Sequence, residues 1–184
     1  MKSPYWLWEK AIPPTVCEQM IQEAKSMKLL NGIIGSKNKP IEDKSIRDNK
    51  IVFLPQNHWF EGILLNHARW ANQLANWQYN INACENIQVA SYKPRQKYDL
   101  HADECLLEDD KEWQRKITVV CQLSKKEDFT GGGLYIEKYS EDTSVLQNQG
   151  DLVTFPSLLL HKAAPVKTGN RLTVVAWITG PRFT

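Results

Sequence analysis

The sequence predicts an α+β fold that is mainly β, in which N-terminal helices pack on one face of an antiparallel sandwich or barrel. Two observations predict it: residues 1–85 contain two stretches with helical apolar spacing, and residues 86–184 contain short β-branched and aromatic runs separated by turn residues. Helices followed by many short strands are typical of a sheet whose helices lie on one side. The length of 184 residues is that of one domain.

Two helices are expected in the N-terminal part. The first begins at Pro14-Thr15, where we expect an N-cap, and its apolar spacing continues to Leu30. The second covers residues 58–77, and its apolar face consists of Phe60, Ile63, Leu64, His67, Ala71 and Leu74. Between them, residues 31–50 are rich in Gly, Pro, Lys and Asp and predict a long loop with little order, followed by a short strand at 51–54.

The C-terminal part reads as a series of short strands. The β-branched and aromatic runs lie at residues 86–92, 115–123, 133–137, 151–155 and 171–178. Gly-containing turn sequences separate several of them, at residues 130–133, 148–150 and 167–170. We therefore expect one domain over residues 1–184, with a helical and loop part at 1–85 and a β core at 86–184.

The composition is that of a globular protein and limits the classes of partner. The chain is 42% hydrophobic and 24% charged, with seven Trp, and its net charge of +2 is too small to indicate a nucleic-acid or anionic membrane surface. No apolar run approaches the roughly 20 residues that span a bilayer. The first residues lack the apolar stretch and cleavage site of a signal peptide. We expect a soluble, cytoplasmic protein with no membrane or nucleic-acid partner.

Four cysteines are scattered along the chain without a C-x-x-C pair. In a cytosolic protein such residues are free thiols that pack as small apolar side chains, and we expect this of Cys17, Cys84, Cys105 and Cys121. Cys105 also lies close to the motif described next, so it is a candidate to approach a site.

The segment "KYDLHADE" places His101 and Asp103 two positions apart. In an extended segment, residues i and i+2 point to the same face, so both side chains can bind one ion. Two histidines and one carboxylate with open positions are the ligand set of non-haem Fe(II) oxygenases. His58 and His67 belong to the second expected helix, whereas His161 follows an apolar strand and a Pro turn. We therefore favour His161 as the third ligand, although a buried core histidine is the alternative.

Arg171 opens the last strand, ten residues after His161. In a strand, Arg171, Thr173, Val175 and Trp177 share one face. An inward-pointing guanidinium needs a carboxylate partner, because an unpaired buried charge is costly. A small dicarboxylate bound by Arg171 and Thr173 satisfies this need, and an ion pair with a surface acid is the alternative.

These residues together resemble the 2-oxoglutarate- and Fe(II)-dependent oxygenases, in particular their prolyl 4-hydroxylase-like branch. The resemblance extends from about residue 86 to the end and rests on three ordered blocks: "IQVASYKPRQKYDLHADE", "RKITVVCQLSKKEDFTGGGLYI" and "GDLVTFPSLLLHKAAPVKTGNRLTVVAWITGP". It implies a double-stranded β-helix (jelly-roll) core. It also implies Fe(II) and 2-oxoglutarate as cofactor and co-substrate, with ascorbate as a candidate third small molecule.

The resemblance also implies roles for individual residues. Iron would be held by His101, Asp103 and His161, and the distal carboxylate of 2-oxoglutarate by Arg171 and Thr173. Further candidates for contact with the co-substrate are Tyr92 and Gln122; Gln122 stands where several relatives have a tyrosine, and an amide can still donate to a carboxylate. Candidates for the substrate pocket are Arg47, Tyr98 and Trp177. In this family the protein positions and shields the reactants and performs no acid–base catalysis. We therefore name no general base.

The implied reaction is hydroxylation of a C–H bond with succinate and CO₂ as co-products, on a proline of a peptide or protein or on an amino acid. The loop at 31–50 is a candidate lid over the entrance; an ordinary solvated loop is the alternative.

Three other functions remain open. A nucleic-acid demethylase on the same scaffold typically has a second arginine six residues after the first, where this chain has Trp177. A zinc hydrolase with the same three ligands would not explain Arg171 with Thr173. A non-enzymatic jelly-roll binding module normally predicts an eroded ligand set, and all three ligands are present.

Overall fold

The computed structural model describes residues 3–35, 40–104, 112–140 and 142–182. Within these ranges the chain forms the expected mainly β fold. The helices are α1 (Pro14–Lys25) and α2 (Phe60–Leu74), and a 3-10 turn lies at Lys126–Asp128. The strands are β1 (Trp6–Trp8), β2 (Leu30–Asn31), β3 (Arg47–Asp48), β4 (Lys50–Phe53), β5 (Ala83–Cys84), β6 (Gln88–Tyr92), β7 (Lys97–His101), β8 (Trp113–Gln122), β9 (Phe129–Gly131), β10 (Leu134–Ile136), β11 (Leu152–Pro156), β12 (His161–Ala163), β13 (Val166–Gly169) and β14 (Arg171–Pro181).

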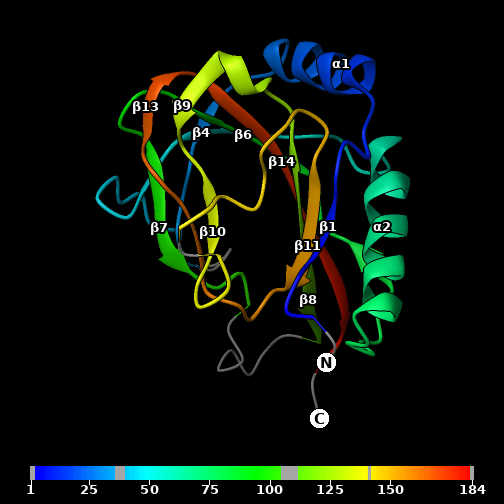
Figure 1. The fold of residues 1–184 in the computed structure, drawn as a ribbon. Helices are drawn as coiled ribbons and strands as arrows, with labels where there is room; N and C mark the ends of the chain where they lie inside the picture. The colour runs from blue at the N-terminus through cyan, green and yellow to red at the C-terminus, as the bar shows by residue number, and fades with distance from the viewer. Residues whose placement is uncertain (1–2, 36–39, 105–111, 141, 183–184) are drawn as a thin grey trace.

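Two antiparallel sheets form the body of the protein. The larger sheet has the order β1-β11-β8-β14-β6-β4-β2, with β5 paired to β14, and the smaller one has the order β10-β12-β7-β3. In Figure 1 the smaller sheet lies opposite β8, β11 and β14, and the two helices lie on the outer side of the larger sheet. This arrangement is the double-stranded β-helix, or jelly roll, with helices on one face. The prediction of fold class is therefore confirmed.

Side chains along the central strands β8 and β14 point alternately to the two faces of the larger sheet. One face packs against the helices, and the other lines the space between the two sheets. On β8, Ile117, Val119 and Cys121 belong to the core cluster beneath the helices. The residues between them point the other way, as Val120 does when it joins the cluster formed with Leu134 and Phe155. β14 alternates in the same manner, so its residues Thr173, Val175 and Trp177 reach the interior. The predicted shared face of the last strand is confirmed.

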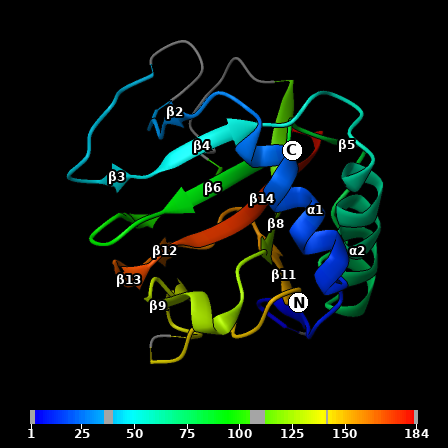
Figure 2. The ribbon, with the colours of Figure 1, turned by 90° about the horizontal axis from the view of Figure 1, so that it is seen from above.

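The helices lie against one face of the larger sheet, as Figure 2 shows from above. Their apolar side chains join those of the sheet in one core cluster. Both helices are shorter than expected. α1 ends at Lys25, so Leu30 lies in β2 and is 45% exposed. The expected N-cap is wrong as well: the cap residue is Pro13, whose carbonyl accepts the backbone N–H groups of Val16 and Cys17, and no side chain caps the helix.

The buried face of α2 is also narrower than predicted. Its buried residues are Phe60, Leu64, Ala68 and Ala71, one turn apart, whereas Leu74 is 48% exposed. His67 packs against Trp8 with ring centroids 5.4 Å apart. His58 lies just before the helix and pairs with Glu23 of α1 at 2.7 Å. His58 thus contacts α1 and His67 contacts β1, and neither lines the pocket.

The N-terminal part has more β structure than expected. The described parts of residues 31–50 are more ordered than the predicted loop, because Ile34 and Ile41 form a β-bridge and β3 pairs with β7. The strands β1, β2, β4 and β5 all extend the larger sheet. β1 pairs with β11, almost at the other end of the sequence. Pairing partners this distant cannot be inferred from local sequence, which explains why β1, β2 and β5 were not expected. β4 agrees with the strand predicted at 51–54.

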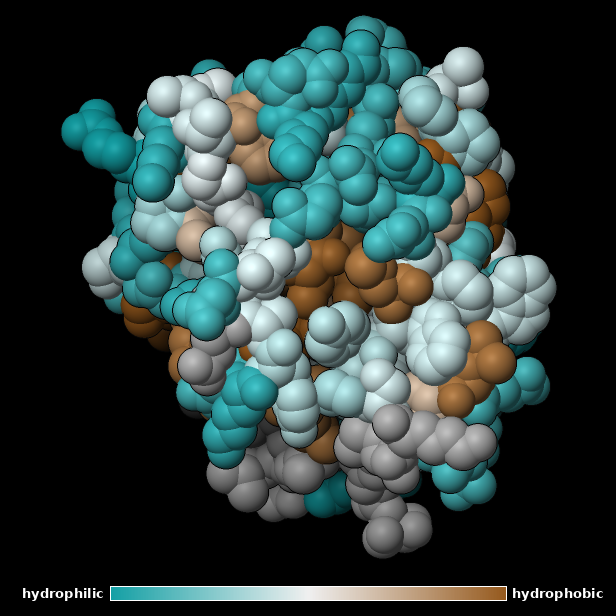
Figure 3. All heavy atoms as spheres, viewed as in Figure 1, coloured by the Kyte–Doolittle hydropathy of each residue, from teal (hydrophilic) through white to brown (hydrophobic). Residues whose placement is uncertain are grey.

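Apolar residues also reach the surface of the face shown in Figure 3, where they gather between β10 and β11 and are surrounded by hydrophilic residues. Across the described ranges, no helix is long and apolar enough to cross a membrane. Cys17, Cys84 and Cys121 are free thiols, as predicted. Cys105 lies outside the described residues.

Candidate functional site

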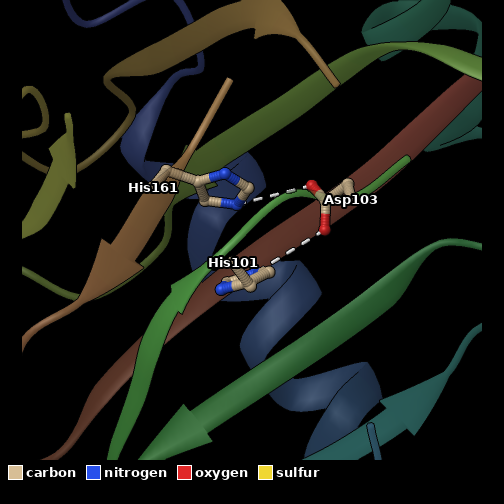
Figure 4. A group of neighbouring side chains, drawn as sticks. All are labelled: His101, Asp103 and His161. Carbon is tan, nitrogen blue, oxygen red and sulfur yellow. Dashed lines mark ion pairs between the residues drawn. The ribbon is translucent and has the colours of Figure 1, made fainter. Parts of the chain in front are cut away.

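His101, Asp103 and His161 come together between the two sheets, as predicted. Figure 4 shows the three side chains pointing toward one another. Asp103 Oδ1 lies 3.6 Å from His101 Nε2, and Asp103 Oδ2 lies 3.4 Å from His161 Nε2. One ligand atom from each residue lies within 4.8 Å of the others. Such spacing suits a single ion between them.

Strand pairing brings the two histidines together. β12 runs antiparallel to β7, and His161 is directly opposite His101 in this ladder. Facing residues have their side chains about 5 Å apart, which is close enough for two ligands of one metal. The histidines lie 60 residues apart in sequence, so this register, not local sequence, creates the site.

Asp103 reaches the site by a different route from the one expected. The strand ends at His101 and Asp103 lies in a bend, so 99–104 is not extended throughout. The bend occurs because the backbone N–H groups of Asp103 and Glu104 both donate to the carbonyl of Ser157, at 3.0 and 3.1 Å. These two hydrogen bonds hold the backbone at the bend, and the Asp103 carboxylate lies next to Nε2 of both histidines.

Both histidine rings are oriented by backbone carbonyls. Nδ1 of His101 lies 2.7 Å from the carbonyl oxygen of Asp99, and Nδ1 of His161 lies 3.0 Å from that of Leu159. Because a carbonyl oxygen only accepts, each Nδ1 carries the hydrogen. Each Nε2 therefore keeps its lone pair on the side of Asp103, as a metal ligand requires.

The electrostatics of the cluster favour an ionised Asp103 and lower the pKa of His161. Burial raises the pKa of the Asp103 carboxyl, but His161 and His101 outweigh it and hold that pKa far below its ordinary value. Burial lowers the pKa of His161, against the attraction of Asp103. A carboxylate with uncharged imidazoles is the protonation state in which these groups bind a divalent cation.

A pocket of about 440 Å³, including its open mouth, surrounds the cluster. Nine of the ten residues named from the sequence line it. They are the three ligand candidates, the co-substrate candidates Tyr92, Arg171 and Thr173, and the pocket candidates Arg47, Tyr98 and Trp177. Gln122 is the exception and lies behind Arg171.

Arg171 is a buried cation without an acid. Its side chain is 3% exposed, and among the described residues it forms no ion pair. Nε donates to Gln122 Oε1 at 3.0 Å, whereas Nη2 is buried without a hydrogen-bond partner. Burial lowers the pKa of Arg171 to about 10, so the guanidinium stays charged at neutral pH. Since Arg171 lines the pocket and no acid of the described residues compensates its charge, the site fits a carboxylate ligand.

Tyr98 is held between Arg47 and His101. Its ring stacks on that of His101 with centroids 3.5 Å apart, and the Arg47 guanidinium lies 4.5 Å from the other face. Arg47 donates to Asn49 Oδ1, the carbonyl of Ile33 and Gln88 Oε1. Its donors are thus engaged by the protein, and its flat face supports Tyr98.

Several residues of the site were missed by sequence reasoning. Thr118 donates to Asp103 Oδ2 at 2.7 Å and lies 3.0 Å from the Ser157 hydroxyl. Arg115 lies over the ring of Trp177 at 3.9 Å and is held by Glu85 through two hydrogen bonds. Thr118 and Gln122 are four residues apart and therefore share one face of the strand. The period of two along 115–123 could thus have predicted that Thr118 lies on the same side as Gln122.

The fold and the site together define a class of protein. A jelly roll that holds two histidines and a carboxylate, with an unpaired buried arginine in the same pocket, is built to bind a divalent metal beside a carboxylate-bearing ligand. Non-haem iron oxygenases that use a 2-oxo acid have this combination.

Comparisons with known proteins agree with that class. The family model described as the 2OG-Fe(II) oxygenase superfamily matches residues 87–179. A PKHD-type hydroxylase of Crocosphaera subtropica is 32% identical over 124 residues, covering 67% of this chain and 55% of that protein. Another from Idiomarina loihiensis is 33% identical over 50% of this chain and 41% of its own length. The chain thus spans about half the length of the curated relatives it matches.

Solved structures share the fold at low sequence identity. A viral collagen prolyl hydroxylase from Paramecium bursaria Chlorella virus-1 superposes with a TM-score of 0.73 at 20% identity, covering 97% of both chains. A prolyl-4-hydroxylase of Pseudomonas putida gives 0.70 at 19% identity, covering 98% of this chain and 94% of the other.

The chain belongs to the 2OG-Fe(II) oxygenase superfamily. The cofactor and co-substrate of this family are Fe(II) and 2-oxoglutarate, which match the donors of the pocket.

Proposed function

We propose that this chain is a dioxygenase domain that hydroxylates a C–H bond of its substrate and forms succinate and CO₂ from 2-oxoglutarate. The observation that carries the proposal is a single pocket in which the His101–Asp103–His161 cluster faces the unpaired guanidinium of Arg171. A metal-binding cluster alone is compatible with hydrolysis. The added buried cation matches a co-substrate with a distal carboxylate, and a zinc hydrolase has no need of it.

In this proposal His101, Asp103 and His161 hold Fe(II), and Arg171 with Thr173 binds the distal carboxylate of 2-oxoglutarate. When bound together, iron and 2-oxoglutarate supply the oxidising chemistry with O₂, which no protein side chain provides. Tyr92 lies beside this anion site, with its ring 5.8 Å from the guanidinium carbon of Arg171. Burial raises the pKa of Tyr92, so its phenol stays protonated as a hydrogen-bond donor.

The protein's own contribution is to position the reactants and exclude water. Tyr98, stacked on His101, and Trp177, beneath Arg115, form two flat walls of the pocket. Both arginines near these walls are engaged, Arg47 by hydrogen bonds and Arg115 by Glu85. The part of the substrate that enters between the walls is therefore uncharged.

We further propose a prolyl hydroxylase-type reaction on a peptide, a protein or an amino acid. Support comes from the flat walls formed by Tyr98 and Trp177 and from the similar proteins. Among these, a prolyl hydroxylase of Trichoplax adhaerens in complex with a peptide fragment shares the fold, with a TM-score of 0.68 at 17% identity over 95% of this chain and 83% of that one. Trp177 in place of a second pocket arginine argues against a nucleic-acid substrate.

An anaerobic titration tests the proposal. Fe(II) and 2-oxoglutarate added to the metal-free protein should produce a weak charge-transfer band in the visible, and His101→Ala should abolish it. Absence of the band with the wild-type protein, or its persistence in the variant, would overturn the assignment. A non-enzymatic module would give the band without succinate release in air. Succinate release stimulated by proline-containing peptides tests the substrate, and no stimulation across the panel would remove the prolyl assignment alone.

A further inference from the structure

Gln122 occupies the position from which a direct contact with the co-substrate was expected, yet it does not line the pocket. Its side chain is buried, with 2% exposure. Oε1 accepts the hydrogen bond from Arg171 Nε, and Nε2 donates to the carbonyl of Ser124 at 3.3 Å. The amide nitrogen points away from the pocket because of this second bond.

The two hydrogen bonds of Gln122 determine how the Arg171 guanidinium is oriented. Gln122 and Thr173 face each other across the β8–β14 ladder, so the amide lies beside the base of the anion site. A guanidinium has five N–H donors in one plane, and a bond at Nε sets the direction of the remaining edge. With Nε engaged, Nη2 remains as the buried donor without a partner.

The neutrality of Gln122 matters as much as its geometry. A glutamate of the same shape would place a carboxylate on Nε and compensate the charge of Arg171 within the protein. An amide oxygen accepts the same hydrogen bond and leaves the full positive charge for a ligand. The absence of any acid paired with Arg171 in the described part of the chain fits this reading.

We propose that Gln122 is a positioning residue for the co-substrate: it orients Arg171 by accepting from Nε and, being uncharged, reserves the guanidinium for the distal carboxylate. This inference rests on the proposed function, in which Arg171 binds 2-oxoglutarate. It gives the glutamine a role different from the direct contact expected where relatives have a tyrosine. The role acts only on ligands that have a distal carboxylate.

Binding measurements with two 2-oxo acids test this selectivity. Calorimetric titrations of the Mn(II)-loaded protein would compare 2-oxoglutarate with 2-oxobutyrate, which has the same metal-binding head but ends in a methyl group. The variants are Gln122→Glu, which adds the competing charge, and Gln122→Met, which keeps the shape and removes the acceptor. Gln73→Glu, on the exposed side of α2, is the matched charge control.

We expect Gln122→Met to weaken 2-oxoglutarate binding about tenfold, the scale of one lost hydrogen bond to a charged group, and Gln122→Glu to weaken it further. Binding of 2-oxobutyrate should change by less than about twofold in both variants, and Gln73→Glu should change neither ligand, since only the distal carboxylate meets Arg171.

The outcomes separate this inference from the proposed function. If the wild-type protein does not prefer 2-oxoglutarate over 2-oxobutyrate, Arg171 does not bind a distal carboxylate and both proposals fall. If the preference exists but survives in Gln122→Glu, the role of Gln122 is wrong and the proposed function stands. An equal loss for both ligands would show general damage to the site and would also refute the inference.

Discussion

Replacing Thr118 by valine is the sharpest test of how the metal site is held. The substitution keeps the β-branched shape and removes the hydroxyl that donates to Asp103 Oδ2 at 2.7 Å. Thr118 is fully buried, so water does not replace the lost donor. The backbone of Asp103 would keep its hydrogen bond to the Ser157 carbonyl, but the carboxylate would lose the hydrogen bond from Thr118.

The magnitude follows from the kind of bond. A hydrogen bond to a charged group contributes about 1.5–3 kcal/mol, and each 1.4 kcal/mol is about tenfold in a dissociation constant. We therefore expect metal affinity to fall about 10- to 100-fold, the range typical of lost hydrogen bonds to metal ligands. Thr118→Ser should recover most of the affinity because it restores the hydroxyl. Ser157→Ala should have a smaller effect, since its hydroxyl contacts Thr118, 3.0 Å away.

Calorimetric titration of the metal-free protein with Mn(II) measures these constants. Thermal unfolding of the same metal-free variants serves as the control. An unchanged melting temperature would show that weaker Mn(II) binding comes from the lost orientation of Asp103 and not from a less stable protein. A Thr118→Val protein that binds Mn(II) as tightly as the wild type would refute the reasoning. So would equal weakening in Thr118→Val and Thr118→Ser, because the hydroxyl would then be irrelevant.

Three further predictions concern the ligands, the helical layer and the thiols. His161→Ala should abolish Mn(II) binding in the same titration, whereas His58→Ala should leave it intact, because His58 pairs with Glu23 away from the pocket; equal loss in both would contradict the assignment. Leu64→Ala should reduce the free energy of unfolding by about 2–5 kcal/mol in denaturant titrations, since this side chain of α2 is fully buried in the core, and an unchanged midpoint would show that α2 does not pack as described. Burial raises the pKa of the Cys84 thiol to about 12, so this cysteine should resist iodoacetamide in the native protein at about pH 8 and react after unfolding, as followed by peptide mass spectrometry.

Much of the site was predictable because family motifs and strand alternation are local properties. The pair His101 and Asp103 was visible as a dyad, and the shared face of Arg171 and Thr173 followed from the period of two in a strand. The choice of His161 over His58 and His67 followed from the strand that precedes it. These predictions needed no knowledge of which strands pair.

The remaining features depended on contacts between distant segments. The bend that carries Asp103 exists because the carbonyl of Ser157 accepts two backbone N–H groups from the other side of the site. The bond from Thr118 to Asp103 and the bond from Arg171 to Gln122 both join neighbouring structural elements that are far apart in sequence. The strand β1, only three residues long, exists through its pairing with β11.

By itself, the sequence determined the class of fold, the candidate metal ligands and the presence of Arg171, a cation that needs a carboxylate partner. Periodicity and residue chemistry can be read from short segments of the chain. Only the tertiary structure decided which oxygen and nitrogen atoms face one another. It placed His161 opposite His101, turned Gln122 from a ligand contact into the partner of Arg171, and left Nη2 without a protein acceptor. The physical reason is that strand register and burial, which set these contacts, are properties of the whole packed chain.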